Sequence, residues 1–238
     1  MTIAGNYRDW KGWNEGTFAS VSPADAVYFA AETAALVGGE RSPVVLEIGF
    51  GNANFAQWAI AQGWRYQGNE IDSGLVAMGL EKGLDVHSAD VPWPDAAFDL
   101  VVAFDVLEHV ALQELPGLLA RIRMTLKPGG LFLARFPSGD SPFARHIQHG
   151  DISHLSQIGT GMVEQLSLAV DLEIVQVRRP AFPVFGLGLG RALRRIMVTA
   201  LRKVIGAILR VAFFDNQPRV ISPNMVIVLR KPVTHVVA

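Results

Sequence analysis

The sequence contains no cysteine, which excludes disulfide bonds, thiolate metal sites and cysteine nucleophiles. Charged residues are also scarce, at 18%, whereas half of the 238 residues are hydrophobic, so the chain can bury a large core. A formal net charge of −1 does not favour a polyanion as the general partner. The N-terminus lacks a basic stretch followed by an apolar one, so we expect no signal peptide and a cytoplasmic location.

Acidic residues are missing from residues 186–214, although this segment holds six of the 21 basic residues. The rest of the chain carries 15 basic and 22 acidic residues, a formal charge of −7. Apolar residues cover much of the segment, and four arginines recur at spacings that keep them on one helical face, namely Arg191, Arg195, Arg202 and Arg210. These features predict a basic amphipathic helix.

This basic helix has two interpretations. A cationic stripe beside a broad apolar face is typical of a helix on an anionic membrane surface, here the inner membrane face. The alternative is a lid or homodimer helix packed on protein. Arg202 and Lys203 lie in the middle of the segment and make a membrane span costly. Nucleic acid is not an expected partner, because the rest of the chain is acidic and the arginines lack interleaved aromatic residues.

Apolar runs alternate with helical patterns between residues 44 and 137, which predicts βαβ units and a parallel sheet with helices on both faces. Strands are expected at 44–50, 64–71, 84–90, 97–107, 131–137, 172–179 and 223–232. Helices are expected at 54–62, 73–83, 112–130 and 160–170; the third begins near Leu115, because Pro116 fits only a first helical turn, and it ends in a turn. The predicted organisation is an N-terminal helical lid segment (1–43), a ligand-binding core (44–180), a helical insert (181–222) and a final strand with a tail (223–238).

The first predicted strand ends in the glycine loop "LEIGFGNANF" (46–55). Glycines at 49 and 51 match the start of the dinucleotide fingerprint G-x-G-x-x-G, but Asn54 occupies the third glycine position. Glu70 lies about 20 residues further on, where such a site places an acid for a ribose hydroxyl. The match is partial, so an NAD(P)-dependent oxidoreductase stays an alternative.

Acids end three successive predicted strands, at Glu47, Glu70 and Asp90. The carboxyl ends of parallel strands line the crevice in which open α/β sheets bind ligands. Carboxylates repel a pyrophosphate, but they suit ribose hydroxyls, an ammonium group and an adenine amine. The crevice therefore favours a cationic nucleoside such as S-adenosylmethionine.

Four ordered stretches resemble motifs of the class I S-adenosylmethionine-dependent methyltransferases, in their small-molecule branch. They cover about two fifths of the chain and are "LEIGFGNANF", "YQGNEIDSG", "SADVPWPDAAFDLVVAFDVLEHV" and "LKPGGLFLARFP". The resemblance implies an α/β fold with a doubly wound, seven-stranded, mostly parallel sheet, whose antiparallel last strand follows the helical insert. Ala53 departs from the family, where many members have a third glycine; this matters only if the position needs a positive φ.

The resemblance also implies roles for individual residues. Glu47 would hold the ammonium of S-adenosylmethionine, Glu70 would accept from both ribose hydroxyls, and Asp90 would meet the adenine amine. Phe104 and Asp105 would lie near the transferred methyl group. The residues expected to contact the cofactor are Glu47, Gly49, Phe50, Gly51, Asn52, Glu70, Ile71, Asp90, Val91 and Phe104.

The expected reaction transfers a methyl group to an oxygen or nitrogen of a small molecule or carbohydrate, lipid-linked as in polysaccharide biosynthesis. His149 and His154 are the candidates for a general base, with His109 and Asp105 nearby. A non-catalytic cofactor-binding scaffold is a further alternative. For Glu108 and His109 the alternative is a solvated helix start.

Two other features keep alternatives open. The stretch "HIQHGDISH" (146–154) offers imidazoles and a carboxylate, but its spacing matches no metal motif, so no metal is expected. The loop that contains it could instead pack over the sheet edge. Tyr7, Trp10 and Trp13 recur at a spacing of three residues, which fits packing on the sheet edge or a lid that excludes water from the site.

Overall fold

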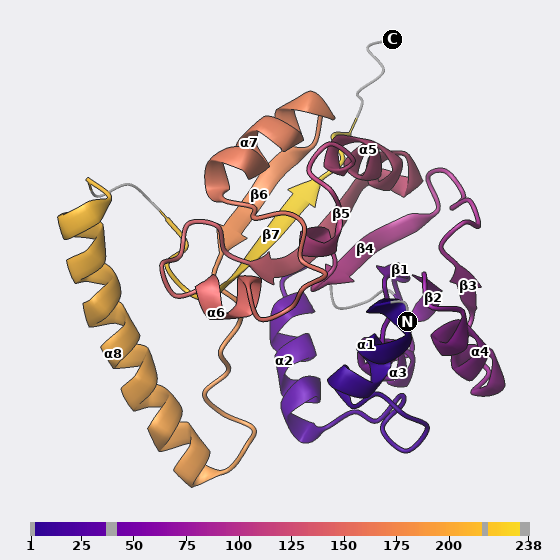
Figure 1. The fold of residues 1–238 in the computed structure, drawn as a ribbon, viewed down its shortest axis with the longest axis horizontal. Coiled ribbons are helices and arrows are strands. Elements are labelled where there is room, and N and C mark those ends of the chain that lie inside the picture. The colour runs from indigo at the N-terminus through magenta and orange to yellow at the C-terminus, as the bar shows by residue number, and fades with distance from the viewer. Residues whose placement is uncertain (1–2, 37–41, 216–218, 234–238) are drawn as a thin grey trace.

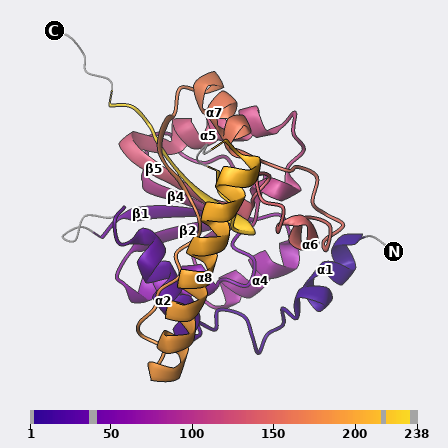
Figure 2. The same cartoon turned by 90° about the vertical axis from the view of Figure 1, so that its left-hand side faces the viewer.

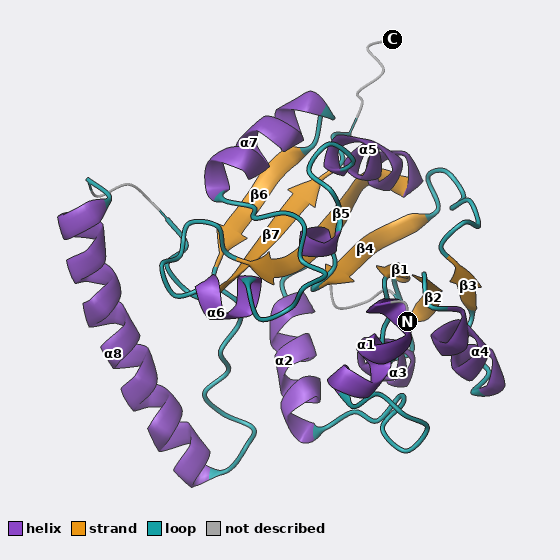
Figure 3. Ribbon diagram, in the orientation of Figure 1, coloured by secondary structure: helices purple, strands orange, loops and turns teal. Residues whose placement is uncertain are grey.

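The computed structural model describes residues 3–36, 42–215 and 219–233. These residues form a seven-stranded sheet in the order β3-β2-β1-β4-β5-β7-β6 (Figures 1 and 3). β7 runs antiparallel to both of its neighbours, and the other pairs are parallel. The strands are β1 (Val44–Ile48), β2 (Arg65–Glu70), β3 (Val86–Ser88), β4 (Phe98–Phe104), β5 (Leu126–Pro137), β6 (Glu173–Arg178) and β7 (Asn224–Arg230). The predicted sheet is confirmed.

Helices cover both faces of the sheet, as a doubly wound fold requires (Figure 1). One face packs against α2 (Pro23–Thr33), α3 (Asn54–Ala61) and α4 (Ser73–Glu81), through a core that includes Phe29, Phe55 and Leu75. The opposite face packs against α5 (Leu115–Thr125) and α7 (Thr160–Ala169), through Leu119 and Val163. Further short elements are α1 (Ile3–Lys11), the 3₁₀ helix η1 (Leu107–His109) and α6 (Arg145–Gln148).

The strand order reverses between β1 and β4. The chain leaves β1 toward β2 and β3 on one side, then returns to β4 and β5 on the other. The loops after β1 and β4 therefore diverge at their carboxyl ends and leave the crevice that open α/β sheets use for ligands. The two loops touch at its base, because a Cβ added at Gly49 would lie 2.8 Å from Cγ2 of Val106.

Several predicted boundaries are wrong. The helix begins at Leu115, as expected, and ends at Thr125, because Leu126 has extended backbone with ψ 139°; the expected turn follows at Gly129, which has φ +78°. Leu126 instead pairs with Phe98 and opens β5. β3 covers only three of the seven residues expected at 84–90, and the segment after Phe104 leaves the sheet for η1.

The predicted insert contains α8 (Leu189–Phe213), which follows β6 and precedes β7. It stands beside the body of the molecule, past the β6–β7 side of the sheet, and its length is exposed in both views (Figures 1 and 2). Among the described residues, no helix is long and apolar enough to span a bilayer. Parts of the predicted end segments and of the insert lie outside the described residues, at 1–2, 37–41, 216–218 and 234–238.

Candidate active site

The glycine loop turns sharply between β1 and α3. Gly49, Gly51 and Ala53 all have positive φ, at +65°, +51° and +57°. Ala53 thus occupies the left-handed region that the third glycine of the family would occupy without strain, at a cost of about 1–2 kcal/mol. The fold retains this strain because Ala53 is fully buried between the loop and α3. The departure noted in the sequence therefore matters.

Glu47 lies beneath this loop and is 3% exposed. The hydroxyl of Tyr66, on β2, donates a hydrogen bond of 2.7 Å to Oε2 of Glu47. Burial raises the pKa of Glu47 to about 8; the Tyr66 hydrogen bond opposes this rise and the charge of Glu70 adds to it. A buried carboxyl group at a strand end is thus ready to ionise when a cation arrives.

Glu70 ends β2 and joins the glycine loop to the start of α4. Its Oε2 accepts from the N–H of Gly51 at 3.0 Å, and its Oε1 accepts from the N–H groups of Ile71 and Asp72 at 2.7 and 3.1 Å. A carboxylate has about four acceptor sites, and three of them are in use here, so this buried side chain can still accept from one hydroxyl. Glu70 is fixed in place by backbone donors and keeps capacity for a ribose.

The other residues expected to contact the cofactor lie at different depths. Phe50 is buried in the core between α3 and α4. Ile71 and Val91 are exposed, at 87% and 41%, and Asp90 lies exposed in the turn after β3. The structure therefore brings Glu47 and Glu70 together at the glycine loop, and places Asp90 at the outer rim of the same strand ends.

Phe104 and Asp105 end β4. Phe104 packs in an aromatic cluster with Phe29 and Phe55, at centroid distances of 5.6 and 5.3 Å. Asp105 has φ +56° and forms a two-pronged ion pair with Arg135 on β5, with Nε to Oδ1 at 2.9 Å. Because Arg135 contacts both carboxylate oxygens, Asp105 is held in one orientation at the crevice wall.

The N-terminal segment covers the glycine loop. The side-chain amide of Asn52 donates to Thr17 O at 2.7 Å, and Asn52 O accepts from the N–H of Ala19 at 2.8 Å. Trp13 lies on the loop, since a Cβ added at Gly51 would be 2.8 Å from its ring. Tyr7 meets Trp13 edge-on at 5.8 Å between centroids. These contacts place the aromatic residues over the crevice and not against the sheet edge.

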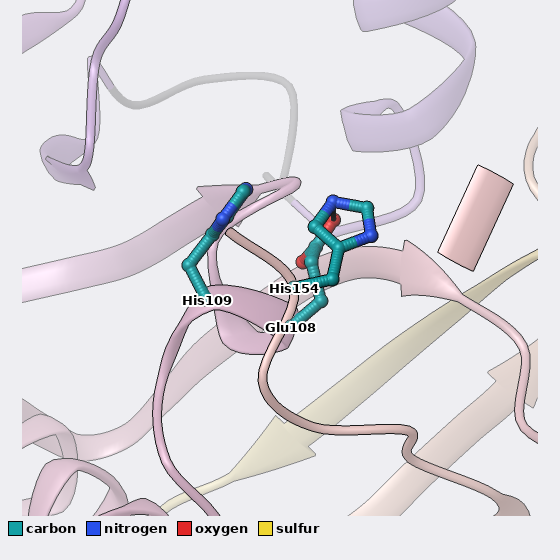
Figure 4. A group of neighbouring side chains, drawn as sticks. All are labelled: Glu108, His109 and His154. Carbon is teal, nitrogen blue, oxygen red and sulfur yellow. Dashed lines mark ion pairs between the residues drawn. The ribbon is translucent and has the colours of Figure 1, made fainter. Parts of the chain in front are cut away.

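A second polar cluster lies beside the crevice, where Glu108, His109 and His154 converge (Figure 4). Glu108 and His109 belong to η1, and His154 belongs to the long loop after β5. Glu108 O accepts from the N–H groups of Leu155 and Ser156, at 2.7 and 3.0 Å, so the backbone fixes the loop onto η1. The His109 ring meets Tyr7 on one side and His154 on the other, at 6.1 and 4.7 Å between centroids.

Burial determines the electrostatics of this cluster. Glu108 is 2% exposed, so the alternative of a solvated helix start is wrong. Burial raises the pKa of Glu108 to about 8, and the charge of Asp105 adds to the rise. Burial and the neighbouring His154 lower the pKa of His109. In the absence of a further cation, burial favours the neutral form of both groups.

Comparison with known proteins identifies the family. The "Methyltransferase domain" family matches residues 22–173, which is more than half of the chain and includes the glycine loop, the strand-end acids and the cluster. The chain belongs to this methyltransferase family. The predicted class, an S-adenosylmethionine-dependent methyltransferase, is confirmed. No curated protein shows significant similarity to the sequence. The basic helix α8 lies outside the matched residues.

Solved structures share the fold of this methyltransferase. A methyltransferase from Archaeoglobus fulgidus is 15% identical, with a TM-score of 0.63 over 88% of this chain and 95% of its own. A chain in the complex of the Trm112 activator with a methyltransferase from Haloferax volcanii is 14% identical, with a TM-score of 0.64 over 98% and 99%. The 1,6-didemethyltoxoflavin-N1-methyltransferase of Burkholderia thailandensis, solved with its substrate and S-adenosylhomocysteine, is 19% identical, with a TM-score of 0.56 over 97% and 85%.

The two histidines proposed as general bases lie at different places in this methyltransferase. His154 lies in the cluster with His109, whereas His149 is exposed and lines a different pocket of about 600 Å³. That pocket lies between the loop after β5 and the end of α8, where Leu209 and Phe213 contribute. His149 therefore does not share the crevice cluster.

Three residues of this site were not predicted from the sequence. Tyr66 and Arg135 are strand residues whose partners, Glu47 and Asp105, lie on other strands, so no local pattern points to them. For Glu108 the sequence leaves a solvated helix start open, although the apolar neighbours in "VLEHV" favour burial. Only the packing of the loop after β5 against η1 shows that Glu108 is enclosed.

Proposed function

We propose that this methyltransferase binds S-adenosylmethionine at the glycine loop and methylates an oxygen or nitrogen of a small molecule or carbohydrate. The observation that carries the proposal is the pair of buried strand-end acids, Glu47 and Glu70, at a loop with repeated positive φ. Two carboxylates suit an ammonium and a ribose, and they oppose a pyrophosphate. The pair therefore supports a cationic nucleoside over NAD.

Each group of the chain has a task in this proposal. Glu70 accepts from one ribose hydroxyl, and Glu47 ionises against the ammonium. When bound, S-adenosylmethionine supplies a methyl group already activated on a sulfonium. A carbon–sulfur bond breaks as the acceptor atom bonds the methyl carbon, the acceptor proton leaves, and a neutral thioether remains. Trp13 and Tyr7 cover the crevice, which excludes water and keeps the reacting atoms aligned.

Calorimetric titration with S-adenosylhomocysteine and with NAD tests the cofactor. We expect the protein to bind S-adenosylhomocysteine and not NAD. Glu70→Ala should bind S-adenosylhomocysteine at least tenfold more weakly, because it removes the carboxylate that accepts from both the glycine loop and the ribose. Lys82→Gln, an exposed change beyond α4, is the control. Binding of NAD alone would support the oxidoreductase, and normal binding by Glu70→Ala would contradict the site. A labelled-methyl screen of small-molecule and cell-envelope fractions then tests for turnover, and binding without turnover would support the scaffold.

The exposed face of helix α8 gives information on the class of methyl acceptor. Ala192 alone among its residues is buried, and its outward apolar side chains are 49–78% exposed: Leu189, Leu193, Ile196, Met197, Leu201, Val204, Ile208 and Val211. At 100° per residue these side chains form one face, and Arg194 and Lys203 fall on its two margins. Cations at the margins of an apolar face are the arrangement of a helix that lies in a membrane interface.

We infer that α8 docks the enzyme on an anionic lipid surface, where a lipid-linked carbohydrate would be the acceptor. Charge supports this occupant, because α8 carries six cations and no acid while the rest of the chain is acidic. A second copy of α8 would bring like charges together. The pocket of about 600 Å³ at its C-terminal end could hold part of such an acceptor.

Vesicle sedimentation of the full chain tests the docking. We expect binding to phosphatidylglycerol vesicles and not to phosphatidylcholine vesicles. The double variant Arg194→Gln with Lys203→Gln should lose about 2 kcal/mol of binding free energy to these vesicles, which is roughly 30-fold in affinity. The matched control removes two exposed charges from the body, by Arg65→Gln with Lys82→Gln. An equal loss of vesicle affinity in both double variants would contradict the inference. So would a protein that sediments as a dimer and does not bind vesicles.

A further inference from the structure

Three side chains of metal-ligand type face one another beside the crevice (Figure 4). One carboxylate oxygen of Glu108 and one ring nitrogen each of His109 and His154 lie within 4.8 Å of one another. The three come from two segments, η1 and the loop after β5, that backbone hydrogen bonds hold together. The set is buried or half-buried, so its members do not spend their polar atoms on bulk water.

The hydrogen bonds of His154 fix which of its nitrogens is available. Nδ1 lies 3.1 Å from Gln148 O, and a carbonyl can only accept, so Nδ1 carries the hydrogen. In the neutral ring Nε2 then presents a lone pair. It lies 4.0 Å from Oε1 of Glu108 and 3.7 Å from Oδ2 of Asp151. A lone pair that faces two carboxyl groups is stabilised by a cation or a proton placed between them.

His109 is oriented in a similar way. Its Nδ1 lies 3.3 Å from Ser153 O and 3.0 Å from Ser153 Oγ, whose hydroxyl in turn donates to Asp151. The Nδ1 hydrogen is thereby directed to the loop, and Nε2 is left as the ligand atom. A backbone carbonyl that orients the far nitrogen is the usual outer partner of a metal-bound histidine.

Glu108 supplies a further, independent sign of a missing ligand. Its side chain is 3% exposed, and its Oε2 has no hydrogen-bond partner among the residues that the structure describes. A buried, unpartnered carboxylate oxygen costs about 1–3 kcal/mol or more unless something binds it. Asp151 is also buried, and its Oδ2 lies 3.6 Å from Nζ of Lys11, which offsets part of its charge.

We propose that Glu108, His109 and His154 bind a divalent transition-metal ion. Two imidazoles and one carboxylate form a ligand set that Zn²⁺, Fe²⁺ and Mn²⁺ accept, with positions left for an exogenous ligand, whereas Mg²⁺ prefers oxygen alone. The role of the ion rests on the proposed function. It would bind the acceptor oxygen, lower the pKa of that hydroxyl and hold it toward the transferred methyl group. The acceptor would be a hydroxyl compound, and its proton would pass to solvent.

Metal binding by the chelator-treated full chain tests the site. Calorimetry with Zn²⁺ and Mn²⁺ should show one ion per chain, with Zn²⁺ tighter than Mn²⁺ and Mg²⁺ weakest. His154→Gln and Glu108→Gln should each weaken binding at least 100-fold. His146→Gln is the matched control, an exposed histidine of the same loop that lies outside the cluster. With Co²⁺, the wild type and the control should show visible absorption bands that the two ligand variants lack.

The outcomes separate this proposal from the proposed function. Each variant is also titrated with S-adenosylhomocysteine, which should bind normally and shows that the crevice is folded. No stoichiometric metal binding by the wild type, or equal binding by His154→Gln, would overturn the site and leave cofactor binding intact. Absence of metal binding by the wild type would indicate that a proton, and not a metal ion, lies between His154 and the carboxyl groups. Metal binding without S-adenosylhomocysteine binding would support the site and contradict the proposed function.

Discussion

Glu47 gives the most specific prediction, which concerns a proton. In the free protein its pKa is about 8, so roughly nine in ten molecules carry the proton at pH 7. The ammonium group of a bound ligand should lower that pKa by about 2 units, to roughly 6, because an opposite charge favours the carboxylate. Binding should then release roughly 0.8 proton at pH 7, and the association constant should rise roughly sixfold between pH 6.5 and 7.5.

Calorimetry of S-adenosylhomocysteine binding in phosphate and in Tris measures this release, since the two buffers differ in ionisation enthalpy. Glu47→Gln cannot ionise, but its amide oxygen still accepts from the Tyr66 hydroxyl, so it should bind more weakly and release no proton. Tyr66→Phe removes the hydrogen bond that lowers the Glu47 pKa in both the free and the bound protein, so the release at pH 7 should fall and its maximum should move to a higher pH. A wild type that releases none, or a Glu47→Gln variant that releases as many, would refute the reasoning.

The same pKa predicts how stability depends on pH without ligand. The folded value lies above the ordinary value of 4.5, so the contribution of Glu47 is complete below pH 4.5 and is lost as the pH rises through 8. The free energy of unfolding of the wild type should therefore fall relative to Glu47→Gln by up to about 1.4 kcal/mol per pH unit in this window. Urea titrations at pH 5, 6, 7 and 8 measure the difference, and parallel curves would contradict the prediction.

The remaining predictions concern the loop, the lid and one ion pair. Ala53→Val should destabilise the fold by about 2–3 kcal/mol, because it places a β-branched residue at a buried left-handed position. Ala53→Gly should change the free energy of unfolding by no more than about 1 kcal/mol. The reverse order of stabilities in chemical denaturation would contradict the backbone strain at Ala53. Trp13→Phe should remove most of the change in tryptophan fluorescence on S-adenosylhomocysteine binding, since Trp13 lies on Gly51; a full change in the variant would place the signal elsewhere. Arg178→Met should cost about 3 kcal/mol, because it removes the ion-pair partner whose Nη1 lies 2.6 Å from the buried carboxylate of Glu32, and the exposed Arg179→Met is its control in thermal melts.

The cofactor side of the site could be predicted from sequence because its signals are local. The glycine loop, Glu47 and Glu70 each lie at a strand end, and strand ends follow from the alternation of apolar runs and turns. Parallel strands then bring their carboxyl ends to one edge without further information. Helix and strand boundaries were less certain, as at Leu126, where strand pairing across the sheet replaced the last helical turn.

The acceptor side could not be predicted in this way, because distant segments meet there. His149 and His154 are five residues apart, yet one lines the pocket at α8 and the other joins Glu108 and His109. The backbone turn from Asp151 to His154 and the two hydrogen bonds to Glu108 O decide which histidine turns inward. Sequence periodicity carries no information on such contacts, since the loop has no regular period.

By itself, the sequence determined the doubly wound sheet, the site of the cofactor loop and the basic amphipathic character of α8, since these depend on periodicity, turn residues and charge along a short stretch. Only the tertiary structure decided that Ala53 is left-handed, that Trp13 lies on Gly51, and that Glu108 is buried against two histidines. The physical reason is burial: the energy of a carboxyl group or a strained residue is set by the groups packed around it, and these come from all parts of the chain.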